Sequence, residues 1–336
     1  MPPRISVLIP TYNQASLLRE ALRSVLIQTF DDFEIVVSDD CSTDETREIV
    51  EAFDDPRIRY YRNSQNLGYG DNLASGSSNV RGDILYLLGH DDLLLAGALE
   101  QTYGAFDRDP SVGVVVRPYY WFDKSPRKPV RSVGPYDSER DTTLSVQQGP
   151  KAIHAIFSSA GQLSGLGYRR SMMQQGFHRH IFTAHIYPLA DILRHAKAVY
   201  LRDYTVAVRI ESSMTRHNRK IYEPSPTETW IEMFETIYSG LEFEYIRKDV
   251  VDFICSTNSV GLVQLRNYGD TSIVAREIRT LLRRRKANLL SPSFIAFSLL
   301  SLLTPSAILS RLSDAYKRRI LGPNVDVPVK TFDRLP

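Results

Sequence analysis

Residues Gly82 to Leu94 read GDILYLLGHDDLL, and this stretch decides the fold that we expect for the chain. The run from Asp83 to Leu88 has the composition and length of a buried strand. Two carboxylates, Asp91 and Asp92, follow almost directly. In open α/β sheets, ligands bind beyond the carboxyl ends of the strands. The stretch therefore predicts a buried strand that delivers two acidic side chains to a binding edge.

Strand and helix patterns alternate through the N-terminal part of the chain. Short apolar runs predict strands at 5–9, 33–37, 58–61, 83–88 and 112–116, and helical spacing predicts helices near 17–26, 42–53 and 95–106. Ser42 and Glu45 have the spacing of a capping box and predict the start of the second helix. This order predicts an α/β fold with a mostly parallel central sheet flanked by helices, followed by a helical C-terminal extension.

Composition narrows the class of protein. The 336 residues are 43% hydrophobic and 24% charged, as in soluble globular proteins, which excludes a disordered or polytopic membrane protein. A net charge of +2 gives no reason to expect a nucleic-acid partner. Cys41 and Cys255 form no C-x-x-C pair, and the apolar run at 5–9 is too short for a signal peptide. We therefore expect a cytoplasmic protein.

The C-terminal region departs from this balance. Residues 276–321 contain ten basic residues against Glu277 and Asp314, and residues 287–310 contain no charge. That uncharged segment is long enough for a bilayer, which needs about 20 apolar residues, but Pro292, Pro305 and several serines make it a poor span. Two interpretations stay open: an interfacial or re-entrant helix at the anionic inner face of the cell membrane, or a helical hairpin packed on the body.

Two acidic pairs dominate the chemistry that the sequence predicts. Asp39-Asp40 and Asp91-Asp92 each follow a predicted strand, so both pairs are expected at one edge of the sheet. The first strand ends in PTYNQ at 10–14 and not in a glycine-rich turn, which disfavours dehydrogenases and P-loop nucleotidases. Neighbouring carboxylates repel one another unless a positive group lies between them. A divalent cation, Mn²⁺ or Mg²⁺, bound with a nucleotide diphosphate would meet that need.

Four ordered motifs make the chain resemble a known family. They are SVLIPTYNQ at 6–14, SVLIQTFDDFEIVVSDDCSTDET at 24–46, NLGYGDN at 66–72 and GDILYLLGHDDLL at 82–94. Together they resemble family-2 glycosyltransferases with the GT-A fold, and within these the abequosyltransferase-like branch of bacterial surface-polysaccharide enzymes. The resemblance implies an inverting glycosyltransferase, specific for a hexosyl or deoxyhexosyl group. Its donor would be a nucleotide sugar and its acceptor a saccharide or lipid-linked saccharide.

The resemblance also assigns residues to the donor. It places the nucleotide against Pro10, Thr11, Tyr12, Asn13, Asp40, Asn66, Gly68, Asn72 and Asp91, and the metal on Asp92. Tyr12 would stack on the base, and Asp40 would accept from its imino N–H. Two positions depart from the family pattern, because Gly89 stands where many members have the first Asp of a D-x-D run and Cys41 replaces a usual glycine.

The acceptor side is assigned in the same way. A general base is expected at the start of a helix in the second half of the chain, with Asp191 as the first candidate and the neutral imidazole of His185 as the alternative. Residues expected on the acceptor or diphosphate side are Gly165, Arg169, Arg209 and His217.

These assignments predict three regions and leave two other functions open. Residues 1–118 would bind the nucleotide sugar, 119–215 would form the acceptor half of the same domain, and 216–336 would be helical and include the basic segment 276–321. A non-catalytic nucleotide- or carbohydrate-binding protein could retain the same fold. A sugar nucleotidylyltransferase is disfavoured, because it would need a glycine-rich basic loop after the first strand.

Overall fold

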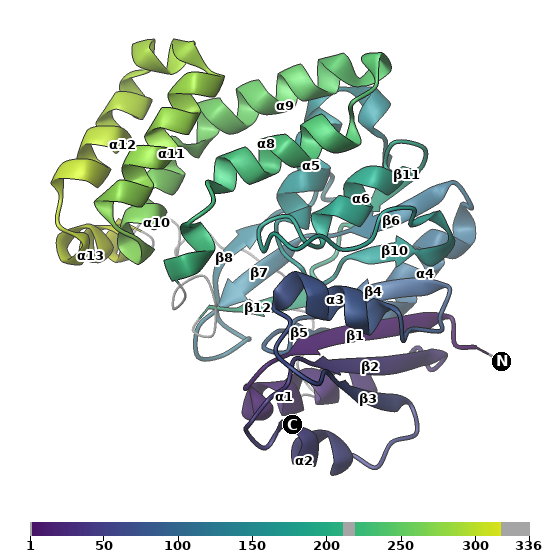
Figure 1. The fold of residues 1–336 in the computed structure, drawn as a ribbon. Coiled ribbons are helices and arrows are strands. Elements are labelled where there is room, and N and C mark those ends of the chain that lie inside the picture. Colours follow the sequence, from purple (N-terminus) through teal and green to yellow (C-terminus); the bar gives the residue numbers. More distant parts are fainter. Residues whose placement is uncertain (1, 211–218, 317–336) are drawn as a thin grey trace. The chain divides into compact units, whose positions relative to one another are not determined.

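The computed structural model describes residues 2–210 and 219–316, and these form two compact units. We call residues 2–210 the sheet unit and residues 219–316 the helical unit; Figure 1 shows the elements of each. Both sheets belong to the first unit, and the elements of the second are all helical.

The larger sheet of the sheet unit has eight strands in the order β3-β2-β1-β4-β10-β6-β11-β9. Strands β3, β2, β1 and β4 are parallel, β10 runs antiparallel to its neighbours β4 and β6, and β11 is parallel to β6. The bounds are β1 Ile5–Thr11, β2 Phe33–Asp39, β3 Ile58–Arg62, β4 Ile84–Leu87, β6 Val112–Val116, β9 Thr142–Leu144, β10 Gly167–Arg169 and β11 Lys197–Tyr200. The mostly parallel central sheet predicted from the sequence is confirmed.

Helices cover both faces of this sheet, which is why every residue of β1 and β2 is buried. Val7 and Ile9 of β1 share a core cluster with Leu22 of α1, whereas Leu8 of β1 lies against Gly76 of α3 on the opposite face. The helices of the sheet unit are α1 Ala15–Leu26, α2 Thr46–Glu51, α3 Tyr69–Ser77, α4 Ala98–Arg108, α5 Pro150–Ala160 and α6 Ile186–Ile192, with short 3₁₀ turns at Val146–Gln148 and Arg170–Met172.

A smaller sheet continues the chain beyond the acidic end of β4. Its strand order is β5-β12-β7-β8, with β5 Leu93–Leu94, β7 Tyr119–Phe122, β8 Pro129–Val133 and β12 Val206–Arg209. Because β5 begins one residue after Asp92 and pairs with β12, residues near 209 are brought next to the acidic pair.

The capping box predicted at Ser42 is wrong. Helix α2 begins at Thr46, its preceding residue is Glu45, and no side chain caps it. The hydroxyl of Ser42 is instead engaged by Asp39 and by the backbone N–H of Asn13. Because the Ser42 hydroxyl is used in these contacts, it does not cap the helix that the local sequence predicts.

The helical unit contains six α-helices within its described residues. They are α8 Pro226–Ile237, α9 Glu244–Thr257, α10 Gly261–Tyr268, α11 Thr271–Arg284, α12 Pro292–Leu303 and α13 Ser306–Tyr316, with 3₁₀ turns η3 Arg219–Tyr222, η4 Leu241–Phe243, η5 Asn258–Val260 and η6 Lys286–Leu290. Across the part of the chain that the structure describes, none of the helices combines the length and apolar character needed to cross a bilayer.

Candidate functional site

Three chain segments meet at the carboxyl end of β1. The carbonyl of Pro10 lies 3.0 Å from Nδ1 of His90, in the segment after β4, and so accepts a hydrogen bond from it. The carbonyl of Thr11 accepts from the backbone N–H of Asp40, after β2, at 2.9 Å. These bonds place the predicted nucleotide segment between the two acidic pairs, and Tyr12 in this segment is 41% exposed.

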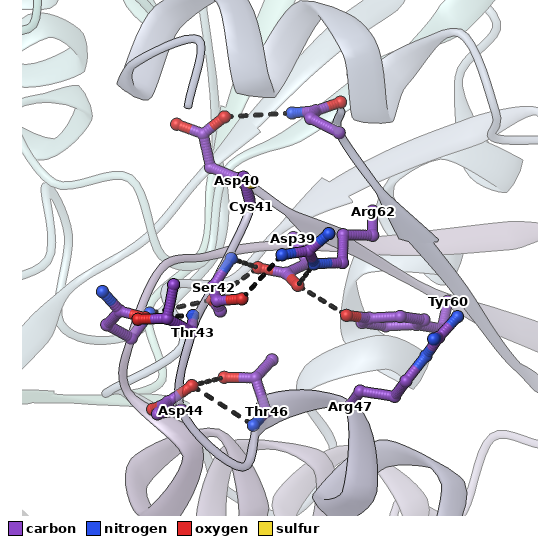
Figure 2. A network of polar contacts seen from close by, with 12 residues as sticks. Asp39, Asp40, Cys41, Ser42, Thr43, Asp44, Thr46, Arg47, Tyr60 and Arg62 are labelled. Atoms are coloured by element: carbon purple, nitrogen blue, oxygen red, sulfur yellow. Dashed lines mark hydrogen bonds and ion pairs between the residues drawn. The ribbon is translucent and has the colours of Figure 1, made fainter. Parts of the chain in front are cut away.

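Asp39 fixes the turn that follows β2, as Figure 2 shows. Its buried carboxylate accepts from the backbone N–H of Ser42 at 3.0 Å and from the hydroxyl of Tyr60 at 2.5 Å. Arg62 lies 3.6 Å away on the same carboxylate. Asp39 is thus held by β3 and by its own turn, which leaves Asp40 as the carboxylate of this pair that faces the loop after β3.

Asp40 organises the segment 66–72. One carboxylate oxygen accepts from the N–H of Leu67 at 2.8 Å and from the amide of Asn63 at 3.1 Å, and the other accepts from the N–H of Gly68 at 2.8 Å. Asn66 also accepts from the N–H of Gly68, at 3.1 Å. Since a carboxylate oxygen has two lone pairs, Oδ2 of Asp40 retains one that Gly68 does not use.

Asn72 supports this arrangement from α3. Its amide oxygen accepts from the Ser38 hydroxyl at 2.8 Å and from the Asn63 amide at 2.9 Å, while its own amide donates to the Ser38 carbonyl at 3.0 Å. Asp40, Asn66, Gly68 and Asn72, predicted from sequence to share a site, are therefore brought together. In this structure Asn72 and Asn66 act as supports for the loop.

The buried carboxylate of Asp92 accepts hydrogen bonds from three donors. One oxygen accepts from the amide of Gln162 at 2.7 Å and from the hydroxyl of Ser164 at 2.5 Å. The other accepts from the backbone N–H of Arg209 at 2.9 Å. Burial and the nearby Asp91 charge raise the pKa of Asp92 well above its usual range, because these effects outweigh the three hydrogen bonds. The charged form of Asp92 is therefore disfavoured in the folded chain.

The side chains of Asp91, Asp92 and Ser164 all lie close to Gly89. A Cβ built on Gly89 would lie 3.1 Å from Oδ1 of Asp91, 3.2 Å from Oδ2 of Asp92 and 3.3 Å from Oγ of Ser164. The two carboxylates thus approach a common point. A first Asp of a D-x-D run would have to fit its side chain into this space, which gives a physical reason for the glycine.

Arg209 places a cation beside the acidic pair. Its Nε donates to the carbonyl of Asp91 at 3.1 Å, and its Nη2 pairs with Glu20 of α1 at 2.6 Å. The guanidinium also lies over the ring of Phe122, 4.8 Å from the centroid. The structure therefore brings Arg209 to the acidic edge, where the diphosphate side was expected.

His185 lies close to this edge, but both of its ring nitrogens are engaged. Nε2 is 3.0 Å from the carbonyl of Ala160 and must donate to it, so Nδ1, 3.1 Å from the hydroxyl of Tyr69, accepts. Burial lowers the pKa of His185 to about 4, although the bond to Ala160 opposes the shift. The imidazole is neutral, and it positions the Tyr69 hydroxyl, whose pKa is raised by burial and by the charges of Asp91 and Asp92.

Other predicted residues lie elsewhere. Asp191 does not start a helix: α6 begins at Ile186, and Asp191 lies in its last turn, buried, accepting from the N–H of Gln175 at 3.0 Å. Arg169 pairs in register with Ile84, at the opposite end of β4 from Asp92, and donates to the carbonyls of Phe106 and Val112. The structure does not bring either side chain to the acidic edge. His217 lies outside the described residues.

Gly165 has a packing role beside the site. Its φ is +93°, and a Cβ there would lie 2.8 Å from Cδ of Arg117 and 2.9 Å from Cγ2 of Val206. The carbonyl of Gly165 accepts from the buried Arg117 at 2.9 Å. Gly165 thereby fixes the path of the chain next to Ser164, which holds Asp92.

Sequence reasoning missed three residues of the site. Gln162 and Ser164 bind the Asp92 carboxylate, and the Tyr69 hydroxyl faces His185. Ser164 directly precedes the predicted Gly165, and Tyr69 lies within the motif at 66–72, but neither residue type carries a chemical signal by itself. Gln162 had no signal at all.

The residues at this edge can take part in a cation site but do not complete one. Among the described residues, no group of three or more His, Cys, Asp and Glu side chains is placed to hold a metal ion. The donor set is nevertheless suited to Mg²⁺ or Mn²⁺, since it contains two neighbouring carboxylates, and carboxylate oxygens suit these cations. Such a cation would need further oxygens, and a diphosphate provides them.

Comparison with known proteins gives a family match over most of the sheet unit. Residues 6–164 match the family model described as Glycosyl transferase family 2. A GalNAc(5)-diNAcBac-PP-undecaprenol beta-1,3-glucosyltransferase of Campylobacter jejuni is 41% identical over 100 residues, covering 29% of this chain and 32% of that protein. The glycosyltransferase GlyG of Streptococcus pneumoniae is 32% identical over 127 residues, covering 37% and 42%. The chain thus spans about a third of the length of the first curated relatives that it matches.

Solved structures are similar over most of the chain. The structure of Staphylococcus aureus TarS 1–349 with UDP-GlcNAc has a TM-score of 0.61 at 16% identity and covers 93% of this chain and 92% of its own. The mannosyltransferase PcManGT of Pyrobaculum calidifontis, with GDP-Man and Mn²⁺, has a TM-score of 0.56 at 17% identity and covers 95% and 88%. At these identities the likeness establishes the fold.

Proposed function

We propose that this chain, which carries a family-2 glycosyltransferase domain at residues 6–164, moves a sugar from a nucleotide-sugar donor to a saccharide or lipid-linked saccharide acceptor. The observation that supports this most is the meeting of the two acidic segments at the end of β1. His90 binds the carbonyl of Pro10, and Asp40 binds the carbonyl of Thr11. A nucleotide lying on Pro10 to Asn13 would therefore have Asp40 on one side and the Asp91-Asp92 pair on the other.

Each group has a distinct part in the proposal. The exposed ring of Tyr12 would stack on the base, and the remaining lone pair on Oδ2 of Asp40 would accept from the base imino N–H. Asp92, with Asp91 next to it in the chain, would hold a divalent cation together with the diphosphate. When bound, that cation supplies charge stabilisation for the departing diphosphate. Arg209 adds a fixed positive charge at the same edge.

The acceptor class is argued from relatives. The Campylobacter jejuni relative is named for a PP-undecaprenol-linked saccharide, and the GlyG relative is also bacterial. A lipid-linked bacterial saccharide is accordingly the acceptor that we propose for this chain, with a role in surface polysaccharide synthesis. The narrower abequosyltransferase-like assignment rests only on the motifs at 66–72 and 82–94.

Calorimetric titration tests the donor site. UDP, GDP, CDP and dTDP are titrated into the full chain with and without Mn²⁺ or Mg²⁺, beside Asp92→Asn and the surface control Asp137→Asn. We expect one diphosphate to bind with metal, weakly or not at all in Asp92→Asn, and unchanged in Asp137→Asn. Metal-independent binding that Asp92→Asn leaves intact would contradict the metal assignment.

Turnover then separates the proposal from its alternatives. With the sugar donor of the nucleotide that binds, release of nucleoside diphosphate together with a glycosylated acceptor supports transfer. Release of pyrophosphate would indicate a nucleotidylyltransferase. Nucleotide binding without turnover on any acceptor, including polyprenyl-diphosphate saccharides, would favour a non-catalytic binding protein.

A further inference from the structure

The helical unit exposes a set of large apolar side chains close together in the sequence. We define the outer leucine face as Leu289, Leu290, Ile295, Leu299, Leu300, Leu303, Ile308 and Leu312. These residues belong to η6, α12 and α13, which follow one another at the C-terminal end of the unit (Figure 1). Leu290 is 86% exposed and Leu303 is 76% exposed. Single exposed leucines are common on protein surfaces, but this many in one short segment indicate a site that binds a protein or a membrane.

Helix α12 buries Phe294 on one side but exposes a stripe of isoleucine and leucine side chains on the other. Its buried side includes Ser298 and Ser301, whose hydroxyls have no hydrogen-bond partner among the described residues. Ile295, Leu299 and Leu303 recur every fourth residue and are exposed. A surface helix of a globular protein normally buries its apolar stripe and exposes its polar one. This orientation is favourable only when the exposed stripe is also removed from water.

Two hydrogen-bonded side chains fix this orientation. Asn288, fully buried in the middle of η6, donates to the carbonyls of Cys255 at 3.0 Å and Leu281 at 3.3 Å. The hydroxyl of Ser310 in α13 donates to the amide oxygen of Asn267 at 3.2 Å. Because both ends of the segment are bonded to the rest of the unit, α12 cannot simply roll its leucines inward.

The charges around the face identify the kind of partner. Residues 287–310 contain no charged side chain, while Lys286 precedes Leu289 by three positions and Arg311 follows Ile308 by three. Lys286 and Arg311 are exposed, and on α13 the spacing of Ile308, Arg311 and Leu312 puts them on one side of the helix. The sequence adds Lys317, Arg318 and Arg319 beyond the described residues. An apolar strip with cations at its ends matches an anionic lipid surface, which accepts apolar side chains below its headgroups and basic ones among them.

We propose that the outer leucine face docks the helical unit on an anionic lipid bilayer, with α12 and α13 lying in the interface without crossing it. The helix lengths agree with this, since no described helix could span a bilayer. The inference rests on the helical unit alone and does not depend on the activity proposed for the sheet unit.

Vesicle flotation of the full chain, without nucleotide, tests the apolar part of the surface. Leu290→Glu is compared with Leu241→Glu, because both leucines are 86% exposed and Leu241 lies in η4, outside the outer leucine face. We expect wild type and Leu241→Glu to float with phosphatidylglycerol-containing vesicles, and Leu290→Glu to bind at least about tenfold more weakly. Equal flotation of all three proteins, or flotation of none, would overturn the proposal.

Charge variants, added salt and sedimentation test the choice of an anionic bilayer as the partner. Lys286→Gln and Arg311→Gln should each weaken binding to anionic vesicles by roughly fivefold, and added salt should weaken binding of the wild type. Equal binding to purely zwitterionic vesicles would contradict the choice of an anionic surface. If sedimentation instead shows a dimer that Leu290→Glu dissociates, and no flotation occurs, the face is an interface between two copies and the membrane proposal is wrong.

Discussion

Asp92 carries a carboxylate that the fold buries beside a second carboxylate, Asp91. Since burial and the Asp91 charge raise the pKa of Asp92, the folded chain binds a proton there more tightly than the unfolded chain. The contribution of Asp92 to stability is therefore greatest at low pH and decreases as pH rises from the unfolded value of 3.8 through the raised folded value.

Substitution of Asp92 by Asn removes this proton linkage. We expect the free energy of unfolding of the wild type, relative to Asp92→Asn, to increase as pH falls from 7 toward 4. Urea unfolding of both proteins across this range measures the difference, and metal-dependent nucleotide binding should be lost in the variant. A difference that stays constant with pH would show that Asp92 is ionised with no penalty in the folded chain.

Thr11 gives a second prediction at this scale. Its hydroxyl is buried at the end of β1 and has no hydrogen-bond partner among the described residues. Thr11→Val removes the hydroxyl at nearly constant volume. We expect unfolding free energy to rise by about 1 kcal/mol, since an unpaired buried polar group is lost. Ser38→Ala is the matched control, because the Ser38 hydroxyl is bonded to Asn72 and its loss should destabilise. Chemical denaturation measures the unfolding free energy of both variants, which should rise in Thr11→Val and fall in Ser38→Ala.

At the scale of elements, Gly165 shows how one residue holds two segments together. Gly165→Ala should lower the free energy of unfolding by about 1–3 kcal/mol, because alanine rarely adopts a positive φ. Overlap of its Cβ with Arg117 and Val206 should lower it by about another 1–3 kcal/mol. Gly149 has nearly the same φ, +92°, but nothing within 4 Å of its Cβ position. Gly149→Ala should therefore cost only the backbone part. Denaturant midpoints of the two variants should differ accordingly, and equal costs would show that the neighbours of Gly165 yield freely.

The parallel core could be predicted from sequence because its signals are local. The apolar runs of β1, β2 and β4 and the acidic residues after them are contiguous, so their place at one edge follows from strand order. The antiparallel strand β10 could not be predicted in the same way. It has three residues, and its position between β4 and β6 depends on pairing with residues more than 50 positions away.

The candidate site also contains residues that local sequence signals predict and residues that depend on contacts between distant segments. The predicted nucleotide segment, Asp40 and the Asp91-Asp92 pair lie in or next to strand ends, so the sequence could predict that they share one edge of the sheet. Gln162 and Ser164 reach Asp92 from a segment whose path is set by Gly165 and Arg117, and no local pattern marks that path. Asp191 is expected at the start of a helix because aspartate often caps helices. The helix begins five residues earlier, at Ile186, after a turn in which the Ile186 N–H donates to the carbonyl of Thr183.

For the whole molecule, each unit has stabilising contacts of its own. In the helical unit, Glu228 of α8 is bonded to Arg283 and Arg284 of α11. Burial alone would raise the pKa of Glu228, but the hydrogen bonds from Arg284 and Arg283 outweigh it and lower the pKa. This contribution is present above the unfolded value of 4.5 and is lost as pH falls through the folded value.

Glu228→Gln should therefore destabilise the helical unit by about 1–2 kcal/mol at pH 7 and by less near pH 4. Differential scanning calorimetry with and without the nucleotide that binds separates the units, since ligand raises only the transition of the unit that binds it. We expect the variant to shift the ligand-insensitive transition. A shift confined to the ligand-sensitive transition would contradict the division into two units.

The bond between the Arg209 backbone N–H and Asp92 joins residues 117 positions apart. At a synthesis rate of 5–20 residues per second, about 6–23 s pass between the emergence of the two residues. During that interval a nascent chain already carries both acidic pairs but lacks the strand that completes their surroundings. The proposed donor site should consequently be incomplete until β12 has been made. A chain stalled before Thr205 would carry the acidic motifs without the bond between Arg209 and Asp92.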